Sequence, residues 1–352
     1  MGSESGTGTP ARAESGTPDA VSETRRRQDE DGGGGPLERW TRSVLTDSGS
    51  RDRLYRALFY VVAIFFLATT LFPFYWLLVL ALTPNTDIIA GDWTLSFLGL
   101  EIPFPTPQAF RVESFVEVFE VIPFHLYVFN SFVLATITTV IVIMIASLAG
   151  YVFGRLEFPG RGALMLGILA ISYFPPAAFL VPLFEAFTGN AVVIPFLGVE
   201  LFQSPRLVNS PPSMVLPFSA LFLPLAIFIL TTFYAQIPDG LEDAARVEGT
   251  TRLGALFRVI MPLSAPGVAT AAVLTFIAVY NEYFFSSIMA IGNEPQNWSP
   301  LVGGILSYQT QYSTEFNLMA AASIIGVLPV VILVVVAQER IVSGLTAGAL
   351  KE

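Results

Sequence analysis

The amino-acid sequence predicts an all-α protein that crosses a membrane with six transmembrane helices, and two observations lead to this prediction. Of the 352 residues, 53% are hydrophobic and only 13% are charged, with a mean hydropathy of +0.64. A soluble domain of this length cannot bury so much apolar surface, whereas a bilayer accommodates it because lipid replaces water as the solvent. The apolar residues also form stretches of the roughly 20 residues needed to cross the hydrocarbon core. These stretches are approximately residues 57–82, 127–151, 163–187, 214–234, 266–291 and 318–337.

The N-terminal residues 1–50 are predicted to form a disordered cytoplasmic tail, ahead of a transmembrane domain of residues 51–352. The tail is rich in Gly, Ser, Thr, Glu and Arg and has no apolar periodicity. Acidic residues surround the triplet Arg25–Arg27, which favours a solvated tail over a nucleic-acid patch. We therefore expect membrane lipid, and no nucleic acid, as a partner of the chain.

The positively charged residues predict which side of the membrane each segment faces. With the N-terminus in the cytoplasm, the outer segments hold only Arg111 and Arg206, and the other 16 of the 18 Lys and Arg residues lie inside. Positive residues favour the cytoplasmic side, and inverting the topology or removing one helix destroys this bias. The sequence therefore predicts a multi-pass protein of the cell membrane with both termini in the cytoplasm. The outer segments are then residues 83–126, 188–213 and 292–317.

Three scarce residue types exclude several kinds of chemistry. The chain has no cysteine, one histidine, His125, and one lysine, Lys351. Disulfides, thiolate catalysis and metal sites of clustered cysteine or histidine are therefore excluded. A P-loop ATPase motif needs a lysine after its glycine-rich loop, and Lys351 follows no such loop. If ATP drives this protein, a partner subunit binds and hydrolyses it, and we expect no cofactor, metal or catalytic residue in this chain.

Polar residues at membrane depth are candidates for a pathway through the protein. In the fifth apolar stretch Asn281 and Glu282, next to Tyr280, lie about 16 residues from the cytoplasmic start, or roughly 24 Å along a helix. This distance places them in the outer half of the membrane. The alternative role for these residues is hydrogen bonding to neighbouring helices, or exposure at the outer interface.

The cytoplasmic loop 235–262 has the signals of two short helices rather than of a flexible tether. Asp239 is predicted to cap the N-terminus of the first helix, with Glu242 completing a capping box. Gly249 suits the left-handed residue just past its C-terminus, and Pro262 closes the second helix. The apolar stripe of the second helix consists of Leu253, Leu256, Phe257 and Ile260. Two short helices bounded by glycine and proline make a rigid element.

One face of the first predicted helix is small and shallow. It is formed at helical spacing by Leu241, Ala244, Ala245 and Glu248. Small residues let a helix sit close to another surface, so this face suits a cleft in a partner protein. The alternative is an amphipathic element on the membrane surface, for which Ala244 and Ala245 are poor anchors. The residues by themselves leave both roles open.

The same loop resembles a known motif over its whole length. Asp243-Ala244-Ala245, three residues, Gly249, nine residues and then Val259-Ile260-Met261-Pro262 are similar to the EAA motif of binding-protein-dependent transporter permeases. The family pattern is Glu-Ala-Ala, three residues, Gly, nine residues, Ile, any residue, Leu and Pro. The chain differs from it at Asp243, Val259 and Met261. The resemblance extends over about residues 55–352.

Further segments resemble the sugar-importing branch of this family, which is related to the maltose permeases. The loop 188–213 is longer than is usual in the family. The segments that carry the resemblance are Asn130–Phe132, Gly150–Arg161, Phe174–Pro176, Pro182 with Leu183, Tyr280–Phe284 and Gly344–Lys351.

The resemblance implies the architecture of a type I ABC importer permease, in which the loop 235–262 carries cytoplasmic coupling helices. In this family the EAA loop docks into a cleft of the ATPase subunit, and the C-terminal tail of maltose-type permeases inserts between the ATPase subunits. The implied partners are a second permease subunit, a dimer of ATPase subunits that binds the ATP, and an extracytoplasmic substrate-binding protein. The expected ATPase-coupling residues are Asp243, Ala244, Ala245, Gly249 and Pro262. The expected C-terminal ATPase contact consists of Gly344, Leu345, Thr346, Gly348 and Lys351.

The resemblance also implies a sugar or oligosaccharide as the substrate, with a polyol or a glycerol phosphate as the alternative. A secondary transporter is a further alternative, but the predicted spans carry almost no ionisable groups for an ion-coupling site. A membrane enzyme is disfavoured because no set of catalytic polar residues gathers on one inner loop.

Asn297-Trp298-Ser299 matches the acceptor pattern for glycosylation and is followed by Pro300.

Overall fold

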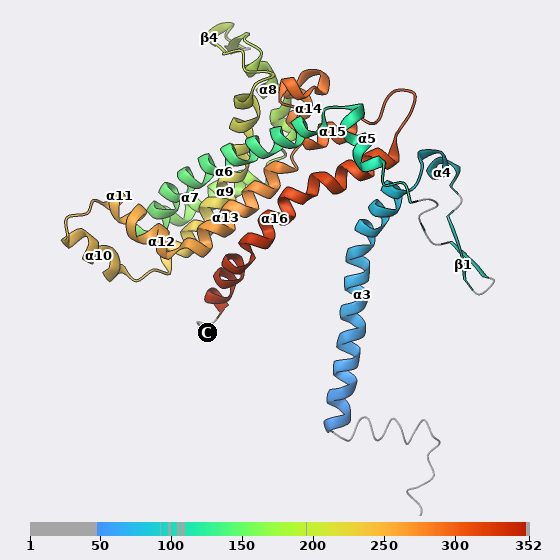
Figure 1. Cartoon of the computed structure of the whole chain (residues 1–352). Coiled ribbons are helices and arrows are strands. Elements are labelled where there is room, and N and C mark those ends of the chain that lie inside the picture. The colour runs from blue at the N-terminus through green and yellow to red at the C-terminus, as the bar shows by residue number, and fades with distance from the viewer. Residues whose placement is uncertain are drawn as a thin grey trace, which may run out of the picture. The chain divides into compact units, whose positions relative to one another are not determined.

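A computed structural model describes residues 48–91, 93–97, 100–103, 106, 110–194 and 196–349 of the chain (Figure 1). The predicted disordered tail therefore lies outside the described residues up to residue 47, as does Lys351. The chain separates into two units, Met1–Pro73 and Phe74–Glu352. Below, inner and outer denote the predicted cytoplasmic and external sides.

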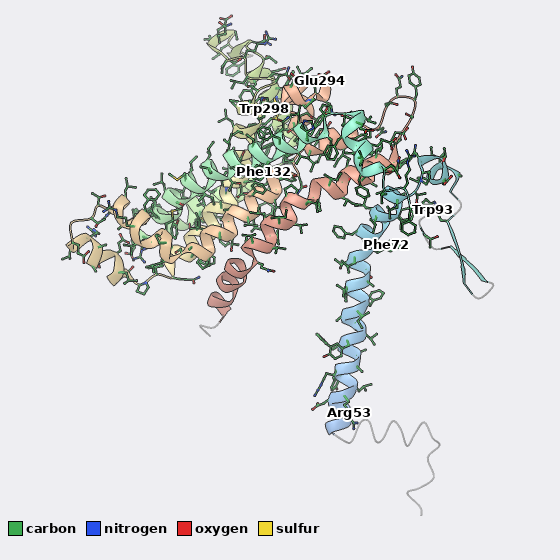
Figure 2. All side chains as sticks on the ribbon, viewed as in Figure 1. Arg53, Phe72, Trp93, Phe132, Glu294 and Trp298 are labelled. Atoms are coloured by element: carbon green, nitrogen blue, oxygen red, sulfur yellow. The ribbon has the colours of Figure 1, made fainter. Side chains whose placement is uncertain are left out.

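The first membrane-spanning helix, α3 (Ser48–Leu82), starts nine residues before the predicted apolar stretch. Its part from Asp52 to Leu82 is long and apolar enough to cross a membrane. Figure 2 shows large side chains that project from it in all directions, and those of Phe59, Phe65 and Phe66 are each more than half exposed. A helix that is apolar all round matches an apolar environment all round, which is what lipid and other membrane helices provide.

The other described spans confirm a multi-pass membrane protein. Three further single helices are long and apolar enough to cross, and two helix pairs pass the same test as bent spans. The single helices are α6 (Phe124–Arg155), α9 (Pro211–Ala235) and α16 (Phe316–Ala349). Counting each bent pair once gives six spans, in agreement with the sequence-based prediction.

The third predicted span is bent rather than continuous. Instead of one helix over 163–187, the chain forms α7 (Arg161–Ser172) and α8 (Ala177–Phe187), which meet at 85°. Pro175 and Pro176 lie at the break, where proline removes backbone donors and clashes with the preceding turn. A cavity of about 340 Å³ lies between these two helices and α9, and its lining side chains are almost all apolar.

The fifth predicted span ends earlier than residue 291. Its membrane helix, α13 (Ala265–Tyr280), is followed by five non-helical residues and the short α14 (Ser286–Met289). The preceding helical segment Arg252–Leu263 meets α13 at 84°. Glu282 lies between α13 and α14 and accepts a hydrogen bond from the backbone N–H of Phe285 at 2.9 Å. The carboxylate therefore stabilises the start of the new turn in place of a continuing helix.

Within the unit from Phe74 onward, α6 packs along α9, and α13 lies against α6, α9 and α16. Small residues permit this close packing of membrane helices. Gly154 of α6 faces α9 so closely that an added Cβ would lie 3.0 Å from the carbonyl oxygen of Thr231. Phe132 of α6, labelled in Figure 2, also makes an edge-to-face contact with Phe276 of α13, with ring centroids 5.6 Å apart.

Two hydrophobic clusters fill this bundle. One includes Phe124, Phe218 and Tyr280 and lies toward the outer side. The other joins the inner halves of α6 and α9 to the inner loop 235–262, through residues such as Leu230 and Leu256, both fully buried. The inner loop therefore shares a continuous core with the membrane helices.

The outer segments contain short β-strands, which the all-α prediction did not include. The described residues form two small antiparallel hairpins, which add to the helical fold without changing its class. The described elements of these segments are α4 (Asn85–Ala90), β1 (Thr94–Phe97), β2 (Leu100–Pro103), α5 (Ser114–Val121), β3 (Ala191–Ile194), β4 (Val199–Gln203), the 3-10 helices η3 (Ile291–Asn293) and η4 (Pro295–Asn297), and α15 (Leu301–Leu306).

The possible glycosylation triplet is folded into the outer surface. The Asn297 amide donates to the carbonyl oxygen of Ile291 at 2.6 Å. Ser299 is fully buried, and its hydroxyl is bonded to the Asn293 amide oxygen at 2.6 Å. In the folded chain the side chains of Asn297 and Ser299 are therefore both engaged in structural hydrogen bonds.

Candidate coupling site

The inner loop between α9 and α13 folds into the two helical pieces that the sequence predicts. The first is α10 (Asp239–Val247). The second runs from Arg252 to Leu263 as α11 (Arg252–Ala255), a π-helical turn η2 (Leu256–Ile260) and α12 (Met261–Leu263). The loop is therefore a structured element and not a tether.

The start of α10 differs from the predicted capping box. The residue at the N-cap position is Pro238, and Asp239 is the first helical residue, with no side-chain cap bond. The Asp239 carboxylate instead forms an ion pair with Arg155 at 2.9 Å. Glu242 does not reach back to the cap either, because its side chain is turned into the protein. The capping-box prediction was therefore wrong, although the predicted helix is present.

The end of α10 agrees with the prediction. Gly249 has a φ of 90°, in the left-handed region that favours glycine. Its N–H donates to the carbonyl oxygen of Arg246 at 3.0 Å, and the N–H of Thr250 donates to that of Ala245 at 3.0 Å. These two bonds form a Schellman motif, which satisfies carbonyl groups at the end of the helix.

The solvent-facing side of α10 includes Asp243, Ala244 and Val247. The side chain of Asp243 is 71% exposed, and its ion pair among the described residues is a long one with Arg246, at 3.8 Å. Ala244 is exposed, Ala245 is half-buried, and Val247 is 88% exposed. Sequence analysis did not single out Val247, although its spacing of three from Ala244 was the available signal. Leu241 instead lines a cavity of about 280 Å³ together with Leu263 and other residues.

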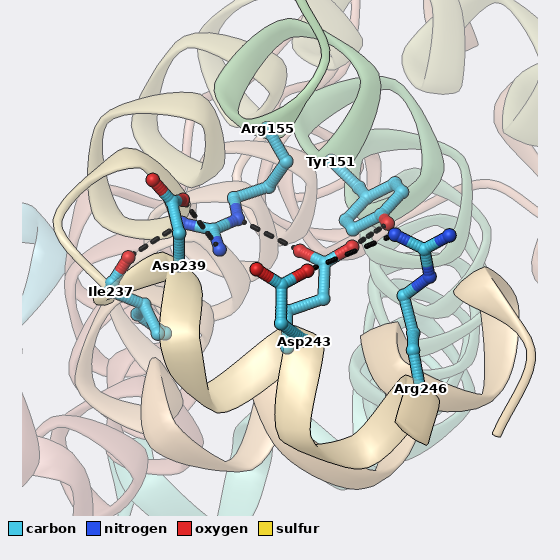
Figure 3. A network of polar contacts seen from close by, with 7 residues as sticks. Tyr151, Arg155, Ile237, Asp239, Asp243 and Arg246 are labelled. Carbon is cyan, nitrogen blue, oxygen red and sulfur yellow. Dashed lines mark hydrogen bonds and ion pairs between the residues drawn. The ribbon is translucent and has the colours of Figure 1, made fainter. Parts of the chain in front are cut away.

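The inward side of α10 is held by two residues of α6, Tyr151 and Arg155 (Figure 3). The hydroxyl of Tyr151 donates to one carboxylate oxygen of Glu242, and Nε of Arg155 donates to the other at 3.0 Å. The Arg155 guanidinium also donates to the carbonyl oxygen of Ile237, just before α10. The side chains of Arg155 and Glu242 are only 4% and 10% exposed. Sequence analysis did not assign this role to any of the three residues.

The second helical piece is half inserted into the bundle. Thr251 caps it by accepting a hydrogen bond from the N–H of Gly254 at 3.1 Å. Of the predicted apolar stripe, Leu256 and Ile260 are fully buried, whereas Leu253 and Phe257 are exposed. Pro262 follows the π-helical turn and is exposed, close to the 84° bend into α13. Leu256 and Ile260 belong to the inner hydrophobic cluster, whose other members come mainly from α6 and α9, so the buried half of the stripe anchors the loop on the bundle.

The candidate pathway residues point in different directions. Tyr280 is fully buried, and its hydroxyl donates to the carbonyl oxygen of Gly326 on α16 at 2.8 Å. Asn281 is exposed, and its amide donates to the carbonyl oxygen of Ile277 at 2.9 Å. Glu282 caps the turn that leads to α14. The described structure therefore does not bring these three side chains together in one site.

The C-terminal candidates fall partly within the described chain. Gly344, Leu345, Thr346 and Gly348 lie in the last part of α16, whose helix continues to Ala349. Lys351 lies outside the described residues. The contact of this end with an ATPase stays a prediction.

Comparison with known proteins identifies the family. Residues 146–346 match the model of the binding-protein-dependent transport system inner membrane component. The chain is 34% identical over 296 residues to the sulfoquinovosyl glycerol transport system permease protein SmoH of Agrobacterium fabrum, covering 84% of this chain and 94% of that protein. It is 33% identical over 300 residues to the trehalose/maltose transport system permease protein MalG of Thermococcus litoralis, covering 85% of this chain and 98% of that one.

A solved structure agrees on the fold. The crystal structure of a bacterial ABC transporter involved in the import of the acidic polysaccharide alginate contains a chain that superposes with a TM-score of 0.62. The match covers 82% of this chain and 97% of that chain, at 17% sequence identity. With the family match and the full-length relatives, these findings show that the chain belongs to the binding-protein-dependent transport system inner membrane components.

Proposed function

We propose that this chain is a permease subunit of an ATP-driven importer and that, with a second permease subunit, it forms the path for a sugar or oligosaccharide. A binding protein on the outer side delivers this substrate. Family membership supports the transport role, and the names of the relatives support the substrate class, since they specify sulfoquinovosyl glycerol and trehalose or maltose. The path itself makes and breaks no covalent bond, so the protein is a transporter and not an enzyme.

The observation that carries the coupling mechanism is the exposed face of α10. A short helix that is capped at its end, held from behind and exposed along Asp243, Ala244 and Val247 suits insertion into a cleft of another protein. Ala244 lets the backbone approach closely, and Val247 supplies an apolar contact. The Asp243 carboxylate is available to a basic residue of the ATPase, because its only described ion pair is long.

ATP binding then drives the switch between two states of the permease. Closure of the ATPase dimer displaces its clefts and the α10 helices inside them, and the path changes from inward-facing to outward-facing. A loaded binding protein must favour the outward-facing state for transport to be coupled to ATP. In this scheme both termini are cytoplasmic, Gly249 and Pro262 keep the loop rigid, and the C-terminal end from Gly344 contributes a further ATPase contact.

Cysteine crosslinking tests the docking role directly. Ala244→Cys is introduced into the full chain, which has no cysteine of its own, and the complex with its ATPase is treated with a bifunctional reagent. We expect a crosslinked product of permease and ATPase, and none from Glu120→Cys, an exposed residue predicted to lie outside. A failure of Ala244→Cys to capture the ATPase would refute the docking role.

A binding screen tests the substrate class. The purified cognate binding protein is titrated with trehalose, maltose, longer maltodextrins, polyols and glycerol 3-phosphate. Tight binding of a saccharide supports the proposed substrate class. Binding of only a polyol or of glycerol phosphate would replace it with the alternative class and leave the permease role intact.

A further inference from the structure

The contact between α10 and α6 indicates which membrane helix receives the motion of the coupling loop. We propose that Tyr151 and Arg155 are positioning residues that fasten α10 to the inner end of α6 through the carboxylate of Glu242, so that α6 moves together with α10. This inference rests on the proposed docking of α10 to the ATPase and names the helix to which docking is transmitted.

The three carboxylates of α10 have different surroundings. Asp239 and Asp243 are 90% and 71% exposed at their side chains, whereas Glu242 is 10% exposed. A buried carboxylate is stable only with close partners, and Glu242 has one donor on each oxygen, both from α6. The Glu242 side chain therefore links α10 to α6.

The geometry of the donors makes the contact rigid. Tyr151 and Arg155 are four residues apart, so they lie one above the other on the same face of α6. The guanidinium of Arg155 is planar and uses all three of its nitrogens, toward Glu242, Asp239 and the backbone carbonyl of Ile237. A shift of α10 along or around α6 would break several of these bonds at once.

Chain connectivity alone would transmit a displacement of α10 only to α9 and α13. The loop is continuous with α9, which ends at Ala235, and with α13, which starts at Ala265. The residues that fasten α10 to α6 are 91 and 87 positions away from Glu242 in the sequence. The contact therefore adds a third membrane helix to the two that the chain itself connects.

The outer end of α6 is hydrogen-bonded to the outer segment 292–317. The Asn130 amide donates to the carbonyl oxygens of Pro295 and Ser299 at 2.8 and 3.0 Å. The Ser131 hydroxyl donates to the carbonyl oxygen of Tyr280 at 3.0 Å. Asn130 and Arg155 are roughly 37 Å apart along a continuous helix at 1.5 Å per residue. Through this one helix, movement of α10 reaches the side at which substrate is delivered.

Spin labels test whether α10 and α6 move as one body. Because the chain has no cysteine, two introduced cysteines are the only labelling sites on it. Gly240→Cys places one label on α10, where an added Cβ meets nothing within 4 Å. Glu157→Cys places the other on an exposed residue just past α6, next to Phe158, whose ring packs against Phe153. The label distance is measured by pulsed electron paramagnetic resonance in the complex with the second permease and the ATPase, with and without Mg-ATP.

We expect the same label distance with and without Mg-ATP when the fastening is intact. Tyr151→Phe and Glu242→Gln, each added to the labelled chain, are expected to give a longer and broader distance when Mg-ATP is present. The matched controls Tyr173→Phe and Glu120→Gln make the same chemical changes at exposed residues and are expected to keep the distance constant. Tyr151→Phe removes one hydroxyl only, so the fold and the binding of the ATPase should persist.

The possible results separate the two levels of the proposal. An ATP-dependent distance in the chain with intact fastening overturns the joint movement of α6 and α10, and so does a constant distance in both Tyr151→Phe and Glu242→Gln. If no ATPase copurifies with the wild-type chain, the docking role fails and this inference fails with it.

Discussion

Gly150 on α6 faces Leu230 on α9 so closely that a Cβ atom on Gly150 would lie 3.0 Å from the Cβ of Leu230. The neighbouring backbone nitrogen of Thr231 would be only 3.2 Å away. Because the obstructing atoms belong to or adjoin the backbone of α9, they cannot move aside by a change of rotamer. This contact sets the spacing of the two helices directly before the residues that hold α10.

We expect Gly150→Leu to destabilise the protein by about 1–3 kcal/mol, the usual cost of overpacking a close-packed interior. The measurement is the midpoint of thermal unfolding of the purified protein in detergent. Gly162→Leu is the control, because an added Cβ at Gly162 meets nothing within 4 Å and the residue is exposed. Equal midpoints for the two variants would contradict the close approach of α6 and α9.

At Gly249 the expected effect comes from the backbone alone. Its φ is 90° and an added Cβ meets nothing within 4 Å, so Gly249→Ala adds conformational strain of about 1–2 kcal/mol without a clash. We expect lower ATP-driven uptake of the sugar found in the binding screen, at unchanged membrane insertion. Gly249→Asn should retain more uptake, because asparagine tolerates left-handed conformations.

Gly249→Pro should have a stronger effect than Gly249→Ala. Proline cannot adopt the positive φ, and it lacks the N–H that bonds to the carbonyl oxygen of Arg246. The expected result is an inserted protein whose ATP hydrolysis is uncoupled from uptake in proteoliposomes. Wild-type uptake by this variant would show that the rigid end of α10 is not needed.

Removing one partner of the buried ion pair between Arg155 and Glu242 should destabilise the inner loop more than removing both partners. Arg155→Met leaves the Glu242 carboxylate buried without its cation, which we expect to destabilise the inner loop by about 3–5 kcal/mol. The double variant Arg155→Met with Glu242→Leu should recover part of this loss. Limited proteolysis within residues 235–262 measures the local opening, and additive effects of the two changes would show that the two side chains do not interact.

Accessibility of single cysteines tests the membrane orientation. Glu157→Cys should react with a membrane-impermeant maleimide only from the cytoplasmic side, and Tyr312→Cys only from the outside. Both residues are exposed, and Tyr312 is 94% exposed in the loop before α16. The cysteine-free wild-type chain is the control for background labelling. The opposite pattern would invert the topology and remove α10 from the cytoplasm.

The sequence by itself determined the features that depend on local pattern. Apolar runs of membrane length located the spans because lipid requires them, and the positive φ of Gly249 followed from its place after a short amphipathic segment. The resemblance in the loop 235–262 led to the family that the comparisons then showed. In each case the deciding neighbours lie within about one or two helical turns or along one continuous stretch.

Only the tertiary structure decided where individual polar side chains go. The local pattern assigned Glu242 to a capping box, but Tyr151 and Arg155 offer a buried carboxylate two strong donors from residues 91 and 87 positions away. A weak local cap cannot compete with charge-assisted bonds in a buried site. No periodicity within a single segment records those long-range partners.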